Sequence, residues 1–123
     1  MSDYKKLKVW KYAHKLVLEM HQSVKKFPED EKYSLVSQIR RAASSIPTNI
    51  AEGCGQLDNS NLVRFLGIAR GSAFELEYLI LLSKDLDYLK KEEYSEFNKK
   101  IEQLIGMITN LIKSLNTKKF NHD

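Results

Sequence analysis

The chain has 123 residues, of which 42% are hydrophobic and 29% charged, and its formal net charge at pH 7 is +4. This balance predicts one globular domain over residues 1–123 and excludes a disordered chain. The single cysteine excludes an internal disulfide, and no apolar run approaches the ~18 residues that a membrane span needs. The N-terminus shows no secretion signal, so we expect a cytoplasmic protein without a membrane partner.

The positive charge is concentrated towards the two ends of the sequence. Residues 1–27 hold seven lysines against two acids, and residues 90–123 hold seven lysines against five acids, whereas the middle of the chain is slightly acidic. Such asymmetry is typical of a protein with an anionic partner at its terminal segments. A solvated lysine-rich face explains the same pattern, and the composition leaves both explanations open.

The first expected helix spans about Leu7 to Lys26, with apolar residues at helical spacing. Trp10 lies on this apolar stripe, which favours a core position over the alternative of stacking on a nucleic-acid base. The helix should end at Phe27, because the residue before Pro28 avoids helical geometry.

The second expected helix begins after Ser34, whose hydroxyl suits an N-cap, and ends near Cys54 in the glycine-rich string EGCG. Pro47 lies inside its apolar pattern. Proline lacks an N–H and its ring crowds the carbonyl four residues back, so we expect a kink near Ala43. Serine hydroxyls just before the proline could bond the freed carbonyls. Polar residues are unusually dense on this helix.

Four strings carry a resemblance to a known family. QIRRAASSIPTNIAEGCG and FLGIARGSAFELEYLILLSKDL, together with LKVWKYAHKL and KFPEDEKYSL, resemble the four-helix-bundle family named for the 23S rRNA intervening-sequence proteins of bacteria. The resemblance covers roughly residues 7–89. It implies a fold similar to that of accessory proteins of diversity-generating retroelements, which form five-membered rings and associate with nucleic acid and a reverse transcriptase. It brings no catalytic motif.

The third expected helix spans about Ser60 to Leu89, with Asp58 or Asn59 as its cap. Folding it back on the second helix would place Gly67 opposite Ser45, so that the two backbones approach closely there.

The same fold-back would place Gly71 opposite Arg41, and would bring Arg40 and Arg41 within about a turn of Glu75. We therefore predict an arginine–carboxylate pair across this crossing. The full set of residues assigned to this structural motif is Arg40, Arg41, Pro47, Asn49, Glu52, Gly53 and Glu75.

The fourth expected helix spans about Glu92 to Asn116. Four helices joined by short turns predict an all-α, antiparallel up-down four-helix bundle with a proline-kinked second helix.

No catalytic or cofactor chemistry is indicated. His14 and His21 are seven residues apart, about 10 Å along a helix, and cannot share one metal ion. Cys54 lies at a helix C-terminus, where the helix dipole disfavours a thiolate. Glu75 and Glu77 point to different sides of their helix, so they form no acid–base pair. We therefore expect a protein that is not an enzyme and that binds no cofactor or metal.

Binding remains as the expected activity. An up-down bundle brings the start of the first helix and the end of the fourth to one pole, where a lysine cluster could neutralise RNA or DNA phosphates without reading sequence. A scaffold that binds only proteins is the alternative. The lysines expected at the pole are Lys5, Lys6, Lys8, Lys11, Lys113, Lys118 and Lys119.

Self-association is expected from the breadth of the apolar pattern on the third helix. Phe65, Leu66, Ile80 and Leu82 fall at angles that should not all face one core. Covering such a surface predicts a homo-oligomer, for which a dimer is the general alternative. The expectation of a five-membered ring, and of a reverse transcriptase or other protein partner, comes from the family resemblance alone.

Overall fold

The computed structural model describes residues 3–121, and their side chains through Thr117, as a bundle of four α-helices without a strand in that range. The predicted all-α four-helix class is confirmed. The helices are α1 (Lys8–Ser23), α2 (Leu35–Cys54), α3 (Asn59–Asp85) and α4 (Lys91–Asn121), and short 3-10 turns lie at η1 (Tyr4–Lys6), η2 (Val24–Lys26) and η3 (Glu29–Glu31).

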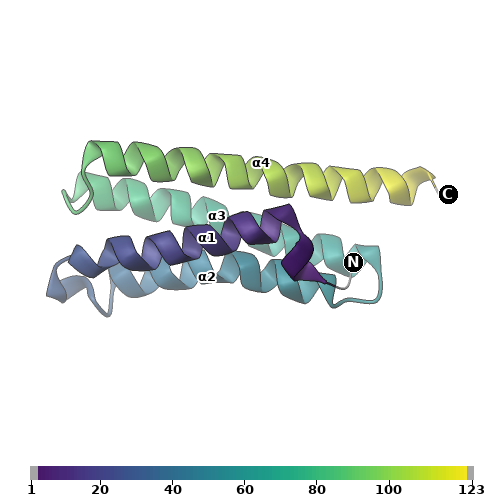
Figure 1. The fold of residues 1–123 in the computed structure, drawn as a ribbon, viewed down its shortest axis with the longest axis horizontal. Helices are drawn as coiled ribbons and strands as arrows, with labels where there is room; N and C mark the ends of the chain where they lie inside the picture. The colour runs from purple at the N-terminus through teal and green to yellow at the C-terminus, as the bar shows by residue number, and fades with distance from the viewer. Residues whose placement is uncertain (1–2, 122–123) are drawn as a thin grey trace.

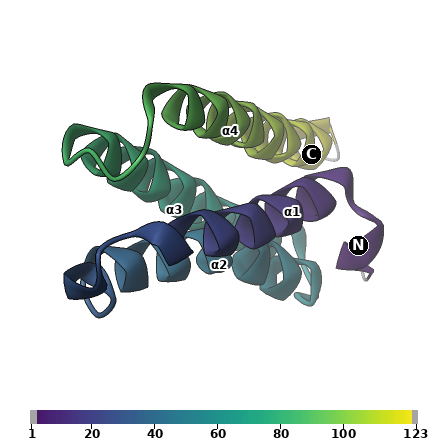
Figure 2. The same ribbon diagram turned by 60° about the vertical axis from the view of Figure 1, so that its left-hand side comes forward.

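Successive helices run in opposite directions, as Figures 1 and 2 show. Contacts between α1 and α4 join Tyr12 to Gln103 and Lys26 to Glu93, so residue numbers rise on one helix while they fall on the other. The N-terminus of α1 and the C-terminus of α4 therefore lie towards the same end of the bundle (Figure 1).

Acidic side chains bond the first backbone N–H groups of α2 and α3. Asp58 caps α3 by accepting a hydrogen bond from the backbone N–H of Asn61 at 2.8 Å, as predicted. Ser34 occupies the predicted N-cap position of α2, but its hydroxyl makes no capping bond. Instead, Oε1 of Glu31 accepts from the N–H of Leu35 at 3.5 Å.

The end of α3 comes four residues before the predicted Leu89. Asp87 adopts a left-handed conformation with φ of 65°. The backbone N–H of Tyr88 then donates to the carbonyl of Ser83 at 2.8 Å, and the backbone N–H of Asp87 donates to the carbonyl of Lys84 at 2.9 Å. This pair of bonds closes the helix in the way that glycine usually allows. Because no glycine marks this end in the sequence, the apolar pattern predicts a helix that is four residues too long. Helix α4, conversely, continues to Asn121, beyond the predicted Asn116.

The core is built from the apolar faces of all four helices. In α2 and α3 the central side chains are fully buried, among them Ile39, Ile46, Ile50, Leu66 and Leu76. Burying one such side chain contributes roughly 1.5–3 kcal/mol to folding. The periodic apolar pattern thus provides most of the stability, and it leaves the polar residues to decide the details of helix packing.

A tight contact between α2 and α3 lies at Gly53. A Cβ built there would lie 3.0 Å from Cδ1 of Leu62 and 3.0 Å from Cβ of Phe65. The predicted close approach at Gly67 and Gly71 is wrong: both glycines are exposed, and nothing lies within 4 Å of a Cβ built on either. Gly67 and Gly71 therefore do not lie in the contact between α2 and α3.

A polar network crosses the α2–α3 interface at the middle of the motif. The hydroxyls of Ser45 and Ser72 are 2.8 Å apart. Nδ2 of Asn49 donates to the carbonyl of Ser45 at 2.8 Å and to its hydroxyl at 2.9 Å. Ser45 and Asn49 of α2 therefore bond to each other and, through Ser72, to α3, and Asn49 has a structural role.

Pro47 is buried within α2, which is helical from Leu35 to Cys54. The hydroxyl of Ser44 donates to the carbonyl of Arg40 at 2.8 Å, not to Ala43, whose carbonyl lacks its helical partner because of the proline. The kink near Ala43 stays a prediction.

The predicted ion pair between Arg41 and Glu75 does not form. Both side chains are exposed and line one shallow hollow together with Gln38 and Ser45, but no pair within 4.0 Å joins them among the described side chains. Nε of Arg40 is buried without a hydrogen-bond partner in the same part of the chain.

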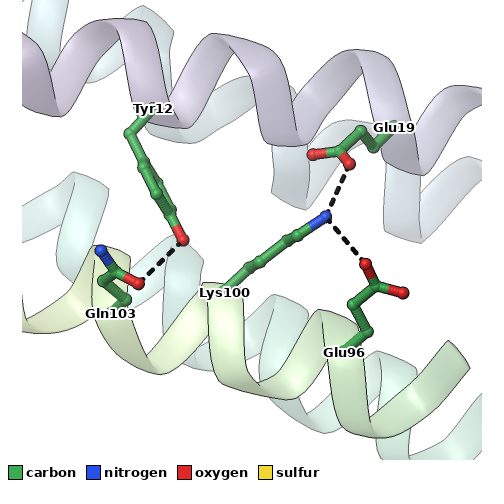
Figure 3. A network of polar contacts seen from close by, with 5 residues as sticks. All are labelled: Tyr12, Glu19, Glu96, Lys100 and Gln103. Carbon is green, nitrogen blue, oxygen red and sulfur yellow. Dashed lines mark hydrogen bonds and ion pairs between the residues drawn. The ribbon is translucent and has the colours of Figure 1, made fainter. Parts of the chain in front are cut away.

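Polar contacts connect α1 to α4 (Figure 3). The ammonium of Lys100 lies 2.7 Å from Oε2 of Glu19 on α1 and 3.6 Å from Oε1 of Glu96, and the hydroxyl of Tyr12 donates to Gln103 at 3.3 Å. The hydrogen bond to Glu19 holds the pKa of Lys100 above its ordinary value. These contacts set the register of α1 against α4.

The close approach at Gly53 predicts a large cost for one added methyl group. We expect Gly53→Ala to lower the free energy of unfolding by about 1–3 kcal/mol, because the methyl group would displace Leu62 or Phe65. The matched control is Gly106→Ala in α4, where nothing lies within 4 Å of the added Cβ. That variant should gain about 0.4–1 kcal/mol. Urea midpoints measure both, and equal midpoints for the two variants would contradict the packing.

The network around Ser45 predicts which polar residues of the motif stabilise the fold. Asn49→Ala should cost about 1 kcal/mol, because it removes two hydrogen bonds in a half-buried site. Arg41→Ala should stay within about 0.5 kcal/mol of the parent, since it truncates an exposed side chain that has no ion pair. A larger destabilisation by Arg41→Ala than by Asn49→Ala in the same urea titrations would restore the ion-pair hypothesis.

Candidate nucleic-acid interface

The end of the bundle that holds the termini is basic. It is built from η1 and the start of α1, the end of α2, the start of α3 and the last part of α4 (Figure 1). Over residues 3–11, 52–64 and 110–117 it has six cationic and three acidic side chains. We call this the basic end; its cationic residues are Lys5, Lys6, Lys8, Lys11, Arg64 and Lys113.

The opposite end, which we call the mixed end, is formed by residues 24–34 and 84–93 and carries six lysines and seven acids. Two of its six lysines have an acidic partner among the described side chains. Lys26 contacts Glu93, and Lys84 lies 3.6 Å from Asp85. The contact with Lys26 holds the pKa of Glu93 below its ordinary value. A hollow of about 790 Å³ at this end is lined by four lysines and three acidic side chains, so both signs of charge are mixed there.

The lysines of the basic end are largely unpaired. All five are exposed, and among the described side chains only Lys6 has an acidic partner, Asp3, at 4.0 Å in a solvent-exposed pair. The structure thus brings Lys5, Lys8 and Lys11 to one pole, with Lys113 on α4 towards the same pole. The side chains of Lys118 and Lys119 lie outside the described residues.

An aromatic cluster adjoins these lysines, and the sequence pattern did not predict it as a unit. The rings of Trp10 and His14, one helical turn apart, stack with centroids 4.9 Å apart and an interplanar angle of 11°. Tyr4, brought back by η1, meets the Trp10 ring edge-on at 5.0 Å. Trp10 packs on the edge of the core and is only half-buried, so its predicted core position is partly correct. The spacing of four residues between Trp10 and His14 was the feature of the sequence from which their contact could have been predicted.

These rings line a hollow of about 400 Å³ between α1 and α2, which we call the aromatic hollow. Its α2 wall includes the buried Pro47. Thr48 and Glu52 also line that wall; both are exposed, and neither side chain makes a hydrogen bond among the described residues. The predicted motif residue Glu52 is therefore one of the three acids of the basic end, with a carboxylate that has no hydrogen-bond partner among the described residues.

The outward side of α3 is apolar, although not where the sequence predicted. Leu66 and Ile80 are fully buried, and Phe65 and Leu82 are half-buried, so these four residues face the bundle. The exposed apolar residues follow one another by three or four positions. This surface, the outer face of α3, consists of Ile68, Gly71, Phe74, Tyr78 and Leu81, with exposed fractions of 44, 44, 59 and 36% for the four large side chains.

Metal and thiol chemistry find no support in the described part of the chain. It holds no group of three or more histidine, cysteine or acidic side chains able to bind a metal ion. Cys54 is buried, and burial raises the pKa of its thiol, which is the opposite of what a nucleophile needs.

Within residues 3–121 no helix is both long and apolar enough to cross a bilayer.

Comparison with known proteins agrees with the fold. A crystal structure of a protein of unknown function from the S23 ribosomal protein family of Bacteroides thetaiotaomicron VPI-5482 superposes with a TM-score of 0.77, at 22% identity, over 85% of this chain and 98% of that one. The comparison with curated proteins finds no match. The family model described as 23S rRNA-intervening sequence protein matches residues 5–110. The chain therefore belongs to the 23S rRNA-intervening sequence protein family.

Proposed function

We propose that this protein is a non-enzymatic, oligomeric accessory protein of the cytoplasm that associates with RNA or another nucleic acid through its basic end. The observation that carries the proposal is the charge polarity of the bundle. The basic end carries six cationic against three acidic side chains, and four of its five lysines have no acidic partner among the described residues, whereas the mixed end carries six lysines against seven acids.

Unpaired lysines are suited to phosphate backbones. Each lysine that neutralises a phosphate releases a condensed counterion, so binding is strong at low salt and independent of sequence. The family name, which refers to an insertion in 23S rRNA, supports RNA as the first polymer to test.

The oligomeric part of the proposal rests on the outer face of α3. A continuous row of exposed apolar side chains marks a protein-contact surface, and the two exposed glycines leave room for a partner to approach the helix backbone. We propose that a second copy covers this face in a head-to-tail contact, which closes into a ring. The number of five subunits is taken from the resemblance to ring-forming accessory proteins.

The apolar face also supports a second candidate function, that of a scaffold that binds proteins and no nucleic acid. A reverse transcriptase or another protein would then cover the outer face of α3. The scaffold function would explain why the apolar side chains of α3 are exposed, but it gives no reason for the unpaired lysines at the basic end.

Charge removal at the basic end tests nucleic-acid association. Replacing Lys5, Lys6, Lys8 and Lys11 by Gln should weaken binding of single-stranded RNA and flatten the plot of log affinity against log salt, by about 0.7 for each phosphate that is no longer neutralised. The matched control replaces four exposed lysines of the mixed end, Lys25, Lys32, Lys90 and Lys91, by Gln and should leave the slope near that of the parent. Equal slopes for the two variants would favour the scaffold.

Light scattering at micromolar concentration tests the oligomer. We expect a mass near five times the 14.3 kDa of the chain. Tyr78→Glu should reduce this mass, because it places a charge in the apolar contact. Tyr33→Glu is the control, since Tyr33 is 87% exposed at the mixed end, outside the α3 face. A parent mass of one chain would refute self-association. A mass of two chains would support a contact between copies but refute the ring.

A further inference from the structure

We propose that the aromatic hollow is a binding site for a single unpaired nucleobase. The inference rests on the proposed association with nucleic acid and adds what the lysines alone do not provide, which is a preference for single strands. The hollow lies between α1 and α2 and is lined by Tyr4, Trp10 and His14 on one side and by Thr48 and Glu52 on the other.

The ring geometry supports stacking. Trp10 and His14 are nearly parallel, and Trp10 covers one face of the imidazole, so the surface that exposed His14 offers to solvent is its other face and edge. A base laid there continues the stack. Tyr4 meets Trp10 edge-on and walls the hollow from η1. Aromatic platforms of this kind are how proteins hold unstacked bases.

The polar groups of the α2 wall distinguish a base from a phosphate. Glu52 is exposed and its carboxylate has no hydrogen-bond partner among the described residues, so it would repel a phosphate placed in the hollow. A carboxylate accepts well from the exocyclic amine of cytosine. Uracil presents a carbonyl oxygen at that position, which the carboxylate disfavours. The hollow should therefore select cytosine over uracil.

Lysines lie near the hollow, but none of the described ones lines it. The ammonium of Lys5 lies 5.9 Å from the centroid of the Tyr4 ring, and exposed Lys11 is one turn before His14 on α1. A strand whose base enters the hollow would keep its phosphates outside, beside these cations. Stacking and phosphate neutralisation thus use separate groups of the same strand.

Trp10 is the only tryptophan in the chain and stacks directly on His14, so its emission reports on a base that stacks on the other face of the His14 ring. We expect unlabelled decamer oligocytidylate to quench Trp10 emission, whereas a duplex of the same length should bind the lysines without quenching. In anisotropy titrations with fluorescein-labelled RNA, oligocytidylate should bind about fivefold more tightly than oligouridylate. Glu52→Gln should reduce this difference.

Substitutions of the rings complete the test. His14→Ala and Tyr4→Ala should each weaken oligocytidylate binding about tenfold, and Tyr33→Ala at the mixed end should not change it. If labelled RNA does not bind even at low salt, the proposed function itself fails. If RNA binds with a normal salt slope, but Trp10 emission and the His14→Ala and Tyr4→Ala affinities are unchanged, the base site is overturned while the function stands. Equal binding of the two oligonucleotides would overturn the role of Glu52.

Discussion

The antiparallel packing of α2 on α3 is the constraint on which the rest of the structure depends. It is set by one buried glycine and one hydrogen-bonded crossing: Gly53 admits Leu62 and Phe65 at the turn end, and Ser45 meets Ser72 farther along. These contacts fix both the separation and the stagger of the two helices. Because the outer helices pack against this pair, its geometry also decides where the two termini and their lysines lie.

The dense polar residues of α2 are explained by the same packing. Asn49 donates hydrogen bonds to Ser45, and the Ser45 hydroxyl contacts that of Ser72 on α3. These polar residues, which by sequence alone could be taken for a functional site, form hydrogen bonds inside the fold. Arg41, Thr48 and Glu52 are exceptions on this helix, because all three are exposed and none has a side-chain partner among the described residues. Polar groups with bonds inside the fold stabilise it, whereas those without partners are free for contacts with another molecule.

The up-down topology converts the uneven distribution of lysines along the sequence into a molecule with one basic end. The basic segments lie at opposite ends of the chain, and four antiparallel helices bring them to one pole, while the two connections at the other pole mix lysines with acids. The proposed base site lies beside the lysines for the same reason, since η1 folds Tyr4 back onto the first turns of α1 and the last turns of α2.

Local signals in the sequence were sufficient for the class, the number of helices and most helix boundaries. Apolar spacing and the Asp58 cap depend on near neighbours along the chain, and so they can be read without the fold. Where a boundary was wrong, as at the end of α3, the local signal was itself unusual, because Asp87 takes a conformation that glycine ordinarily supplies.

The tertiary structure decided which side chains meet. Periodicity gives the spacing of residues on a helix but neither its rotation about its axis nor its stagger against a neighbour, and one residue is about 100° of rotation. This freedom is why the close contact lies at Gly53 and not at Gly67 or Gly71, and why Arg41 does not pair with Glu75. It is also why the Tyr4–Trp10–His14 cluster appeared only in three dimensions: a turn and two helices must be placed together before the hollow exists.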